Sequence, residues 1–169
     1  AIRALAREEG VHASTVLRQV RALEARREDI LVDRALSRLG SQVQSDPQAR
    51  TQADGEGAGL SADRLEREAR RVLRRMCEPG ALLAVAAEMD KAVVVRETDS
   101  GDTTRLAVVD REVAEAMALT EWIACDRPAR ISRYHVTREG RAALNRLVAS
   151  AENCAVGIAE TQTAFAGAA

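Results

Sequence analysis

The sequence predicts a mainly α, α+β protein: an N-terminal three-helix helix-turn-helix unit, a flexible linker, and a C-terminal winged-helix-like domain with a β-hairpin. Three observations lead to this prediction. Two amphipathic segments flank a glycine near the N-terminus, a polar stretch without apolar periodicity follows, and a β-branched run with a turn and a return run lies in the second half. The expected boundaries are 1–44 for the first unit, 45–60 for the linker, 61–150 for the second domain and 151–169 for a tail.

The N-terminal segment has the spacing of two helices joined by a sharp turn. Ala6 is small enough for close helix crossing, and Gly10 can adopt the positive φ that such a turn requires. Val11 is expected to fill the angle between the helices. The inward stripe of the second helix would consist of three residues at helical spacing, Val16, Val20 and Leu23.

The outward face of that second helix has the residue types that contact duplex DNA. Short polar side chains and arginines reach base edges and phosphates in the major groove. The predicted DNA-binding residues are His12, Ser14, Thr15, Leu17, Arg18 and Arg21. Of these, the base contacts are expected from Ser14, Leu17 and Arg18, the phosphate contacts from Thr15 and Arg21, and either DNA binding or helix capping from His12. The alternative interpretation is a helical pair that packs or contacts protein.

A third helix is expected over residues 30–39, with Gly40 as its C-cap, and it would close the small core of the first unit. Its apolar face would contain Leu31 or Val32, Ala35, Leu36 and Leu39. Residues 41–59 are rich in Ser, Gln, Asp, Gly and Ala, so they would bury too little surface to offset the entropy of ordering. We therefore expect a flexible linker there.

The second domain begins with a strong helix, Asp63–Cys77, which Ser61 caps and Pro79-Gly80 stops. Its buried stripe would be Leu65, Ala69, Val72, Leu73 and Met76. The arginines around that stripe fit two interpretations, a solvated face of ion pairs or an electropositive ridge for phosphate or an acidic protein surface. The predicted partner or phosphate surface comprises Arg70, Arg71, Arg74 and Arg75 on this helix and Arg130 and Arg133 further along the chain.

A hairpin is expected next, with strands at 92–97 and 103–109 around a turn at 99–102. Asp110 would cap a helix, Arg111–Cys125, and 131–136 alternates like a half-buried strand. Thr137 would cap a helix reaching about Ser150, and Gly140 would permit close approach to a neighbouring strand. The Tyr134–Leu144 string resembles the strand-to-helix boundary of winged-helix proteins.

Composition excludes several classes of protein. Aromatic residues make up 2% of the chain, too few for a single-stranded nucleic-acid platform built on stacking. The net charge is −1, although residues 1–44 carry eight arginines against six acidic residues.

The three cysteines are odd in number and widely spaced, which argues for a reducing cytoplasm, and Cys77 and Cys125 are expected in the core. No signal peptide or membrane-spanning run is present, so we expect a cytoplasmic protein without membrane contact. Because the chain starts without Met inside a helix, we expect a piece of a longer protein.

No catalytic constellation is evident. The two histidines, His12 and His135, lie in different units without the partners that a metal or nucleophile site needs. Phosphate-binding glycine loops, nucleophile elbows and paired-carboxylate patterns are also absent from the sequence. We expect no enzyme activity, no catalytic residues, no metal and no cofactor.

Two runs together resemble a known family. Val11–Arg21 and the Arg27-Glu28-Asp29-x-Leu31-Val32 run are similar to helix-turn-helix regulators of alphaproteobacteria that activate gene-transfer-agent clusters, which are domesticated prophages. The Leu73–Ala81 and Tyr134–Leu144 stretches also resemble that group. The resemblance implies transcriptional activation of phage-like structural genes and contact with RNA polymerase. Some relatives are thought to act as antiterminators, and the group carries a further C-terminal helical portion.

Three functional hypotheses remain open at this point. The first is an activator that binds double-stranded DNA through the N-terminal unit and RNA polymerase through the arginine-rich second domain. The second is an antitermination factor that binds RNA polymerase with little DNA sequence preference of its own. The third is a helical adaptor that bridges proteins. The motif is compatible with any oligomeric state.

Overall fold

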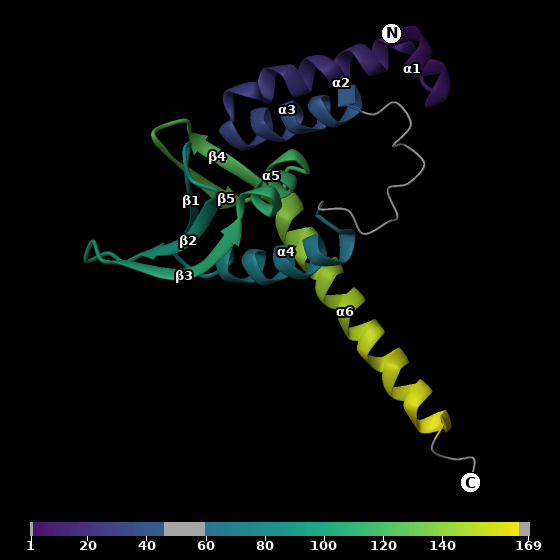
Figure 1. Cartoon of the computed structure of the whole chain (residues 1–169). Coiled ribbons are helices and arrows are strands. Elements are labelled where there is room, and N and C mark those ends of the chain that lie inside the picture. The colour runs from purple at the N-terminus through teal and green to yellow at the C-terminus, as the bar shows by residue number, and fades with distance from the viewer. Residues whose placement is uncertain (1, 46–59, 166–169) are drawn as a thin grey trace.

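The fold is α+β, with six α-helices and a five-stranded antiparallel sheet in the part of the chain that the computed structural model describes, residues 2–45 and 60–165 (Figure 1). The N-terminal elements are α1 (Ile2–Glu8), α2 (Ala13–Ala25), the 3-10 helix η1 (Arg26–Glu28) and α3 (Ile30–Ser45). They are followed by α4 (Ala62–Met76), β1 (Ala81–Ala86), β2 (Lys91–Glu97), β3 (Thr103–Asp110), α5 (Arg111–Leu119), β4 (Ile123–Arg127), β5 (Ile131–Val136) and α6 (Arg138–Phe165). Most of the predicted linker, 46–59, and the end of the predicted tail, 166–169, lie outside the described residues.

The sheet has the strand order β3-β2-β1-β5-β4, and every neighbouring pair is antiparallel. The central strand, β1, places Leu83 opposite Val94 of β2 on one side and opposite Tyr134 of β5 on the other. These side chains point to the same face of the sheet and are buried in one core. The predicted hairpin is confirmed as β2 and β3, and the predicted alternating strand is confirmed as β5.

Helices α4 and α5 cover this core face of the sheet. The predicted stripe of α4 is confirmed, because Ala69, Val72, Leu73 and Met76 are buried and Leu65 packs against the core. Ser61 caps α4, since its hydroxyl accepts a hydrogen bond from the Arg64 amide at 3.2 Å. Cys125 packs against the core as expected, whereas Cys77 is exposed, so its prediction as a core residue was wrong.

Two predictions about α3 were wrong. The helix does not end at Gly40 but continues through it to Ser45, so residues 41–45 are helical rather than linker. A single glycine costs a helix only about 1 kcal/mol relative to alanine, and Gly40 does not take the positive φ of a C-cap. The helix also does not close a separate N-terminal core. Its buried Leu31 and Val32 belong to the core of the sheet, and α3 packs mainly against α5.

The second half also departs from the prediction at three places. The helix expected to reach Cys125 ends at Leu119, and Cys125 lies in β4. The apolar run 81–86, to which we assigned no secondary structure, is the central strand β1. The helix expected to end near Ser150 runs on to Phe165, so residues 151–165 are not a separate tail (Figure 1).

Candidate DNA-binding surface

The turn between α1 and α2 consists of four residues, Glu9–His12, and is closed by two backbone hydrogen bonds. The Val11 amide donates to Ala6 O at 2.9 Å, and the Gly10 amide donates to Arg7 O at 3.4 Å. This is the pattern of a Schellman C-cap, which requires a left-handed residue at the position of Gly10. Gly10 has φ +64°, as the sequence predicted, and no atom lies within 4 Å of the position its β-carbon would take. Backbone conformation rather than space therefore requires glycine here.

The angle between the two helices is filled by residues other than Val11. Ala6 is 5% exposed and Val16 is 3% exposed, whereas Val11 is 42% exposed. The prediction that Val11 fills this angle was therefore wrong. Val20 and Leu23 are half-buried, so the inward stripe of α2 is completed by partly covered residues.

His12 is the N-cap of α2. Its Nδ1 accepts a hydrogen bond from the Ser14 amide at 3.3 Å and lies 2.7 Å from Ser14 Oγ. The imidazole thereby satisfies one of the free amides at the start of the helix, a task usually performed by Ser, Thr, Asp or Asn. The capping role, one of the two that the sequence allowed for His12, is the one that this contact supports.

The predicted contact residues form one face of α2. Ser14, Arg18 and Arg21 follow one another at i, i+4 and i+7, and all three are exposed. Leu17 lies between them on the same face, and Leu17 and Thr15 are half-buried. Neither Arg18 nor Arg21 forms an ion pair with the described residues. Figure 1 shows α1 and the start of α2 at the far end of the molecule, away from the sheet, so this face is open.

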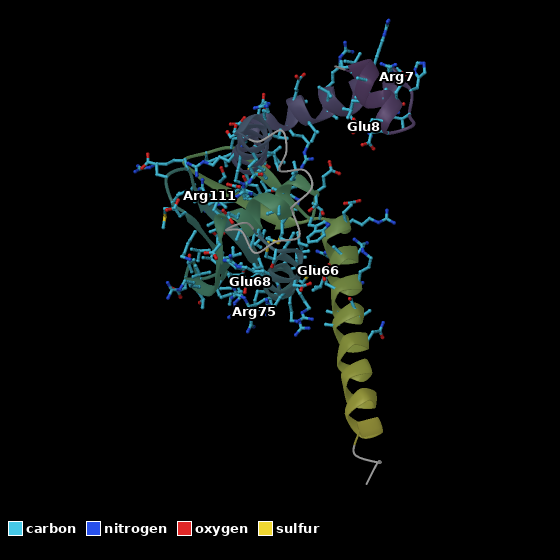
Figure 2. All side chains as sticks on the ribbon, turned by 45° about the vertical axis from the view of Figure 1, so that its right-hand side comes forward. Arg7, Glu8, Glu66, Glu68, Arg75 and Arg111 are labelled. Atoms are coloured by element: carbon cyan, nitrogen blue, oxygen red, sulfur yellow. The ribbon has the colours of Figure 1, made fainter. Side chains whose placement is uncertain are left out.

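The second predicted surface is not one cluster. Arg71 pairs with Glu68 at 2.6 Å, Arg75 pairs with Glu78 at 2.9 Å, and Arg133 pairs with Glu97 at 3.1 Å. These three arginines fit the interpretation of a solvated, ion-paired face. Arg70, Arg74 and Arg130 form no ion pair with any described residue, and Arg130 lies in the turn before β5 rather than on α4. Figure 2 shows Glu68 and Arg75 on α4, at the opposite side of the molecule from Arg7 and Glu8 of α1.

We call the N-terminal elements α1, α2, η1 and α3 the helical arm. A buried hydrogen bond, which the sequence did not reveal, attaches this arm to the sheet. The hydroxyl of Tyr134 donates to Asp29 Oδ1 at 2.6 Å. The same oxygen accepts the Leu31 amide at 2.9 Å, so Asp29 also caps the start of α3. Tyr134 is 0% exposed, and its pKa is raised by burial and by the hydrogen bond to Asp29. The two residues are 105 positions apart, and no local pattern predicts such a pairing.

Two further arginines join the arm to α5. Arg26 donates to the carbonyl oxygens of Ala118 and Leu119 at the end of α5 and pairs with Glu121 at 3.2 Å. Arg38 of α3 contacts Glu112 at 3.2 Å and Glu115 at 3.1 Å, both on α5. Glu115 is 4% exposed, and burial raises its pKa, although Arg38 opposes that effect. The arm is thus fixed at three residues, Arg26 in η1, Asp29 between η1 and α3, and Arg38 in α3.

The start of α5 lies next to this junction. Asp110 takes the N-cap position, but its carboxylate makes no hydrogen bond to the helix, so the predicted side-chain cap is not formed. It pairs instead with Lys91 at 2.5 Å and Arg64 at 2.7 Å, and the hydrogen bond from Lys91 lowers its pKa. Arg111, labelled in Figure 2, is 5% exposed and donates to the carbonyl oxygens of Ala86 and Ala87. Burial lowers the pKa of Arg111.

The described residues contain no group of three or more His, Cys, Asp or Glu side chains placed to hold a metal ion. Among these residues, no helix has both the length and the apolar character needed to cross a membrane. Comparison with known proteins finds no matching family model, no matching curated protein and no matching solved structure.

Proposed function

We propose that the chain is a DNA-binding transcriptional regulator in which α1, the Gly10 turn and α2 act as a helix-turn-helix. The observation that carries this proposal is the turn itself. A left-handed glycine ends α1, His12 caps α2, and the exposed face of α2 then presents Ser14, Leu17, Arg18 and Arg21. Recognition helices use such side chains near their N-terminal end to read base edges.

The attachment of the arm supports the same function. A recognition helix discriminates between sequences only if its orientation is held, because a base contact depends on direction as well as distance. Asp29, Arg26 and Arg38 fix η1 and α3 to the sheet and α5. The second domain then acts as the support of a DNA-contacting arm.

Replacement of Arg18 by alanine tests the base contact. We expect Arg18→Ala to weaken binding to the cognate duplex by about 1–3 kcal/mol and to leave binding to random duplex nearly unchanged, as loss of a base contact should. The measurement is a titration of both duplexes at fixed salt. Arg67→Ala on α4, another exposed arginine, is the matched control and should have no effect. An equal loss on both duplexes would make Arg18 a phosphate contact instead.

RNA polymerase is the partner that the family resemblance supplies for the second domain. Of the four α4 arginines that the sequence predicted for this surface, Arg70 and Arg74 are available to an acidic protein surface, because Arg71 and Arg75 are engaged in ion pairs. Helix α4, which carries them, lies on the side of the molecule away from α1, which leaves room for DNA and polymerase to bind together.

Charge reversal separates these arginines. We expect Arg70→Glu with Arg74→Glu to abolish transcription activation and polymerase co-purification while promoter binding persists. The matched pair Arg71→Glu with Arg75→Glu breaks exposed ion pairs, each worth about 0–1 kcal/mol, and should have the smaller effect. Full activity of the folded double variant Arg70→Glu with Arg74→Glu would mean that these α4 arginines are solvated surface and not a polymerase contact. Polymerase binding by the wild type without any promoter shift would favour the antitermination role.

A further inference from the structure

A cavity of about 520 Å³ opens where the helical arm meets the second half of the chain. Its walls come from α3, the start of α4, the turn between β1 and β2, and the start of α5. Among the described residues, all those that line it are arginines, aspartates or glutamates. Small-molecule sites have volumes in this range, but most of them are lined mainly by apolar side chains. A ligand that fits this cavity is therefore polar over its whole surface.

Two side chains in the wall of the cavity are buried charged groups. Arg111 is 5% exposed and Glu115 is 4% exposed. Arg111 donates to the carbonyl oxygens of Ala86 and Ala87, but its Nε has no acceptor among the described residues. Glu115 Oε2 lies 3.1 Å from Arg38 without the geometry of a hydrogen bond. Buried charged groups normally have complete sets of hydrogen bonds, so this wall is short of polar partners.

The charges around the cavity leave a positive surplus. The four lining arginines and Lys91, which pairs with Asp110, face four carboxylates. Burial raises the pKa of Glu115, and this increases the surplus. A cleft with such a surplus attracts anions.

Arg34 of α3 is the cation of this cavity that is free to bind a ligand. It is exposed, and it forms no ion pair with any described residue. Burial lowers the pKa of Arg111, and the positive charge of Arg34 lowers that pKa further, so the two guanidinium groups repel each other. An anion bound beside Arg34 relieves this repulsion.

The start of α5, a helix of nine residues, adds a second positive feature to the wall. Asp110 at its N-cap makes no side-chain hydrogen bond to the helix, because its carboxylate is held by Lys91 at 2.5 Å and Arg64 at 2.7 Å. The positive end of the helix dipole therefore lacks a side-chain cap. Helix N-termini together with arginines are the groups that bind phosphate in proteins.

We propose that this cavity binds the phosphate monoester of a sugar or of another polyhydroxylated molecule. The phosphate lies between Arg34 and the N-terminus of α5, where its negative charge meets the positive surplus. The hydroxyl groups donate to the exposed carboxylate of Asp90, which forms no ion pair with the described residues. The charged lining offers no apolar contact to a nucleotide base or an acyl chain. None of these residues lies on α2, so the site does not depend on the proposed DNA-binding role.

Thermal unfolding of the full chain at fixed ionic strength tests the proposal with glucose 6-phosphate as the probe. We expect a saturable rise in Tm, because a ligand that binds only the folded state stabilises it. Glucose, which lacks the phosphate, should cause no rise, and gluconate, which carries a carboxylate instead, should cause a smaller one. The proposal is overturned if glucose 6-phosphate causes no saturable rise, or if gluconate or sulfate causes an equal one.

Two variants, studied by titration calorimetry, locate the site. Arg34→Ala should weaken glucose 6-phosphate binding about tenfold or more, since it removes a charged hydrogen-bond donor. Arg67→Ala is the matched control, because Arg67 is an exposed arginine of α4 that does not line this cavity. Asp90→Asn should weaken glucose 6-phosphate binding about threefold and leave inorganic phosphate binding unchanged, since only the sugar contacts that carboxylate.

Circular dichroism of each variant verifies that the fold is retained. Wild-type affinity in folded Arg34→Ala, or an equal loss in Arg34→Ala and Arg67→Ala, overturns the site. An equal effect of Asp90→Asn on glucose 6-phosphate and on inorganic phosphate overturns the assignment of the hydroxyl groups to Asp90.

Discussion

At the scale of single residues, close backbone contacts decide which positions tolerate change. Gly140 lies in the first turn of α6, where its amide donates to Thr137 Oγ1 at 3.0 Å. A β-carbon there would lie 2.0 Å from Trp122 O, a backbone atom that also accepts the Thr137 amide. The sequence predicted both the cap and the close approach from Thr137 and Gly140. It could not identify the approaching segment, which is the turn between α5 and β4 rather than a strand.

This contact makes Gly140→Ala strongly destabilising. We expect the free energy of unfolding to fall by about 3 kcal/mol, since backbone rather than a flexible side chain must move. Gly40 provides the matched control, because it lies inside α3 with nothing within 4 Å of its β-carbon position. Gly40→Ala should raise stability by roughly 0.5–1 kcal/mol through helix propensity alone. Urea unfolding followed by circular dichroism measures both, and equal effects would contradict the contact.

At the scale of elements, periodicity predicted those whose pattern is local. The stripe of α4, the β2–β3 hairpin and the alternation of β5 were recognised because each pattern depends only on residues close together in the sequence. The end of α5 was missed because Glu121, with φ +62°, takes the left-handed position that glycine usually marks. The central strand β1 was missed because the run 81–86 is continuously apolar, so its sequence lacks the alternation of apolar and polar residues that marks a strand. The extension of α3 past Gly40 was missed because a weak breaker was treated as a stop.

The packing of α3 on α5 should depend on pH through Glu115. Burial raises the pKa of this carboxyl, so the folded protein holds the proton to a higher pH than the unfolded chain does. Folding stability from this group is therefore full below the ordinary carboxyl range and is lost as pH rises through the raised pKa. We expect the stability of Glu115→Gln relative to wild type to increase as pH rises from acid to neutral.

Unfolding measured across that pH range gives the difference directly. Glu112→Gln is the matched control, because Glu112 contacts the same Arg38 at 3.2 Å but its side chain is 45% exposed. It removes an exposed ion pair and should cost about 0–1 kcal/mol. If the two variants follow the same course with pH, burial of Glu115 is not the cause.

At the scale of the whole molecule, the arm and the sheet share one core. The sequence predicted a boundary between a unit at 1–44 and a domain at 61–150. In the structure, one hydrophobic core contains residues from both sides of that boundary. Leu31 and Val32 are 0% exposed within the core that contains Leu83, Val94 and Tyr134. The sequence could not show this, because the contacts that attach α3, from Asp29 to Tyr134 and from Arg26 to Ala118, join residues 105 and 92 positions apart. Amphipathic patterning identifies the apolar face of a helix, but it does not identify the element that packs against that face.

A cut between the two halves tests this shared core. We expect a protease recognition site placed within residues 46–59 to be cleaved while the two fragments continue to elute together at micromolar concentration. Burial of Leu31 and Val32 contributes about 1.5–3 kcal/mol each, and the charged hydrogen bond from Tyr134 to Asp29 roughly 1.5–3 kcal/mol more. Val32→Asp in the same cleavable protein is the control, because a carboxylate in the core removes that association and the fragments should separate. Separation of the wild-type fragments would mean that the arm is an independent domain, and the orientation of α2 would then be set by DNA rather than by the sheet.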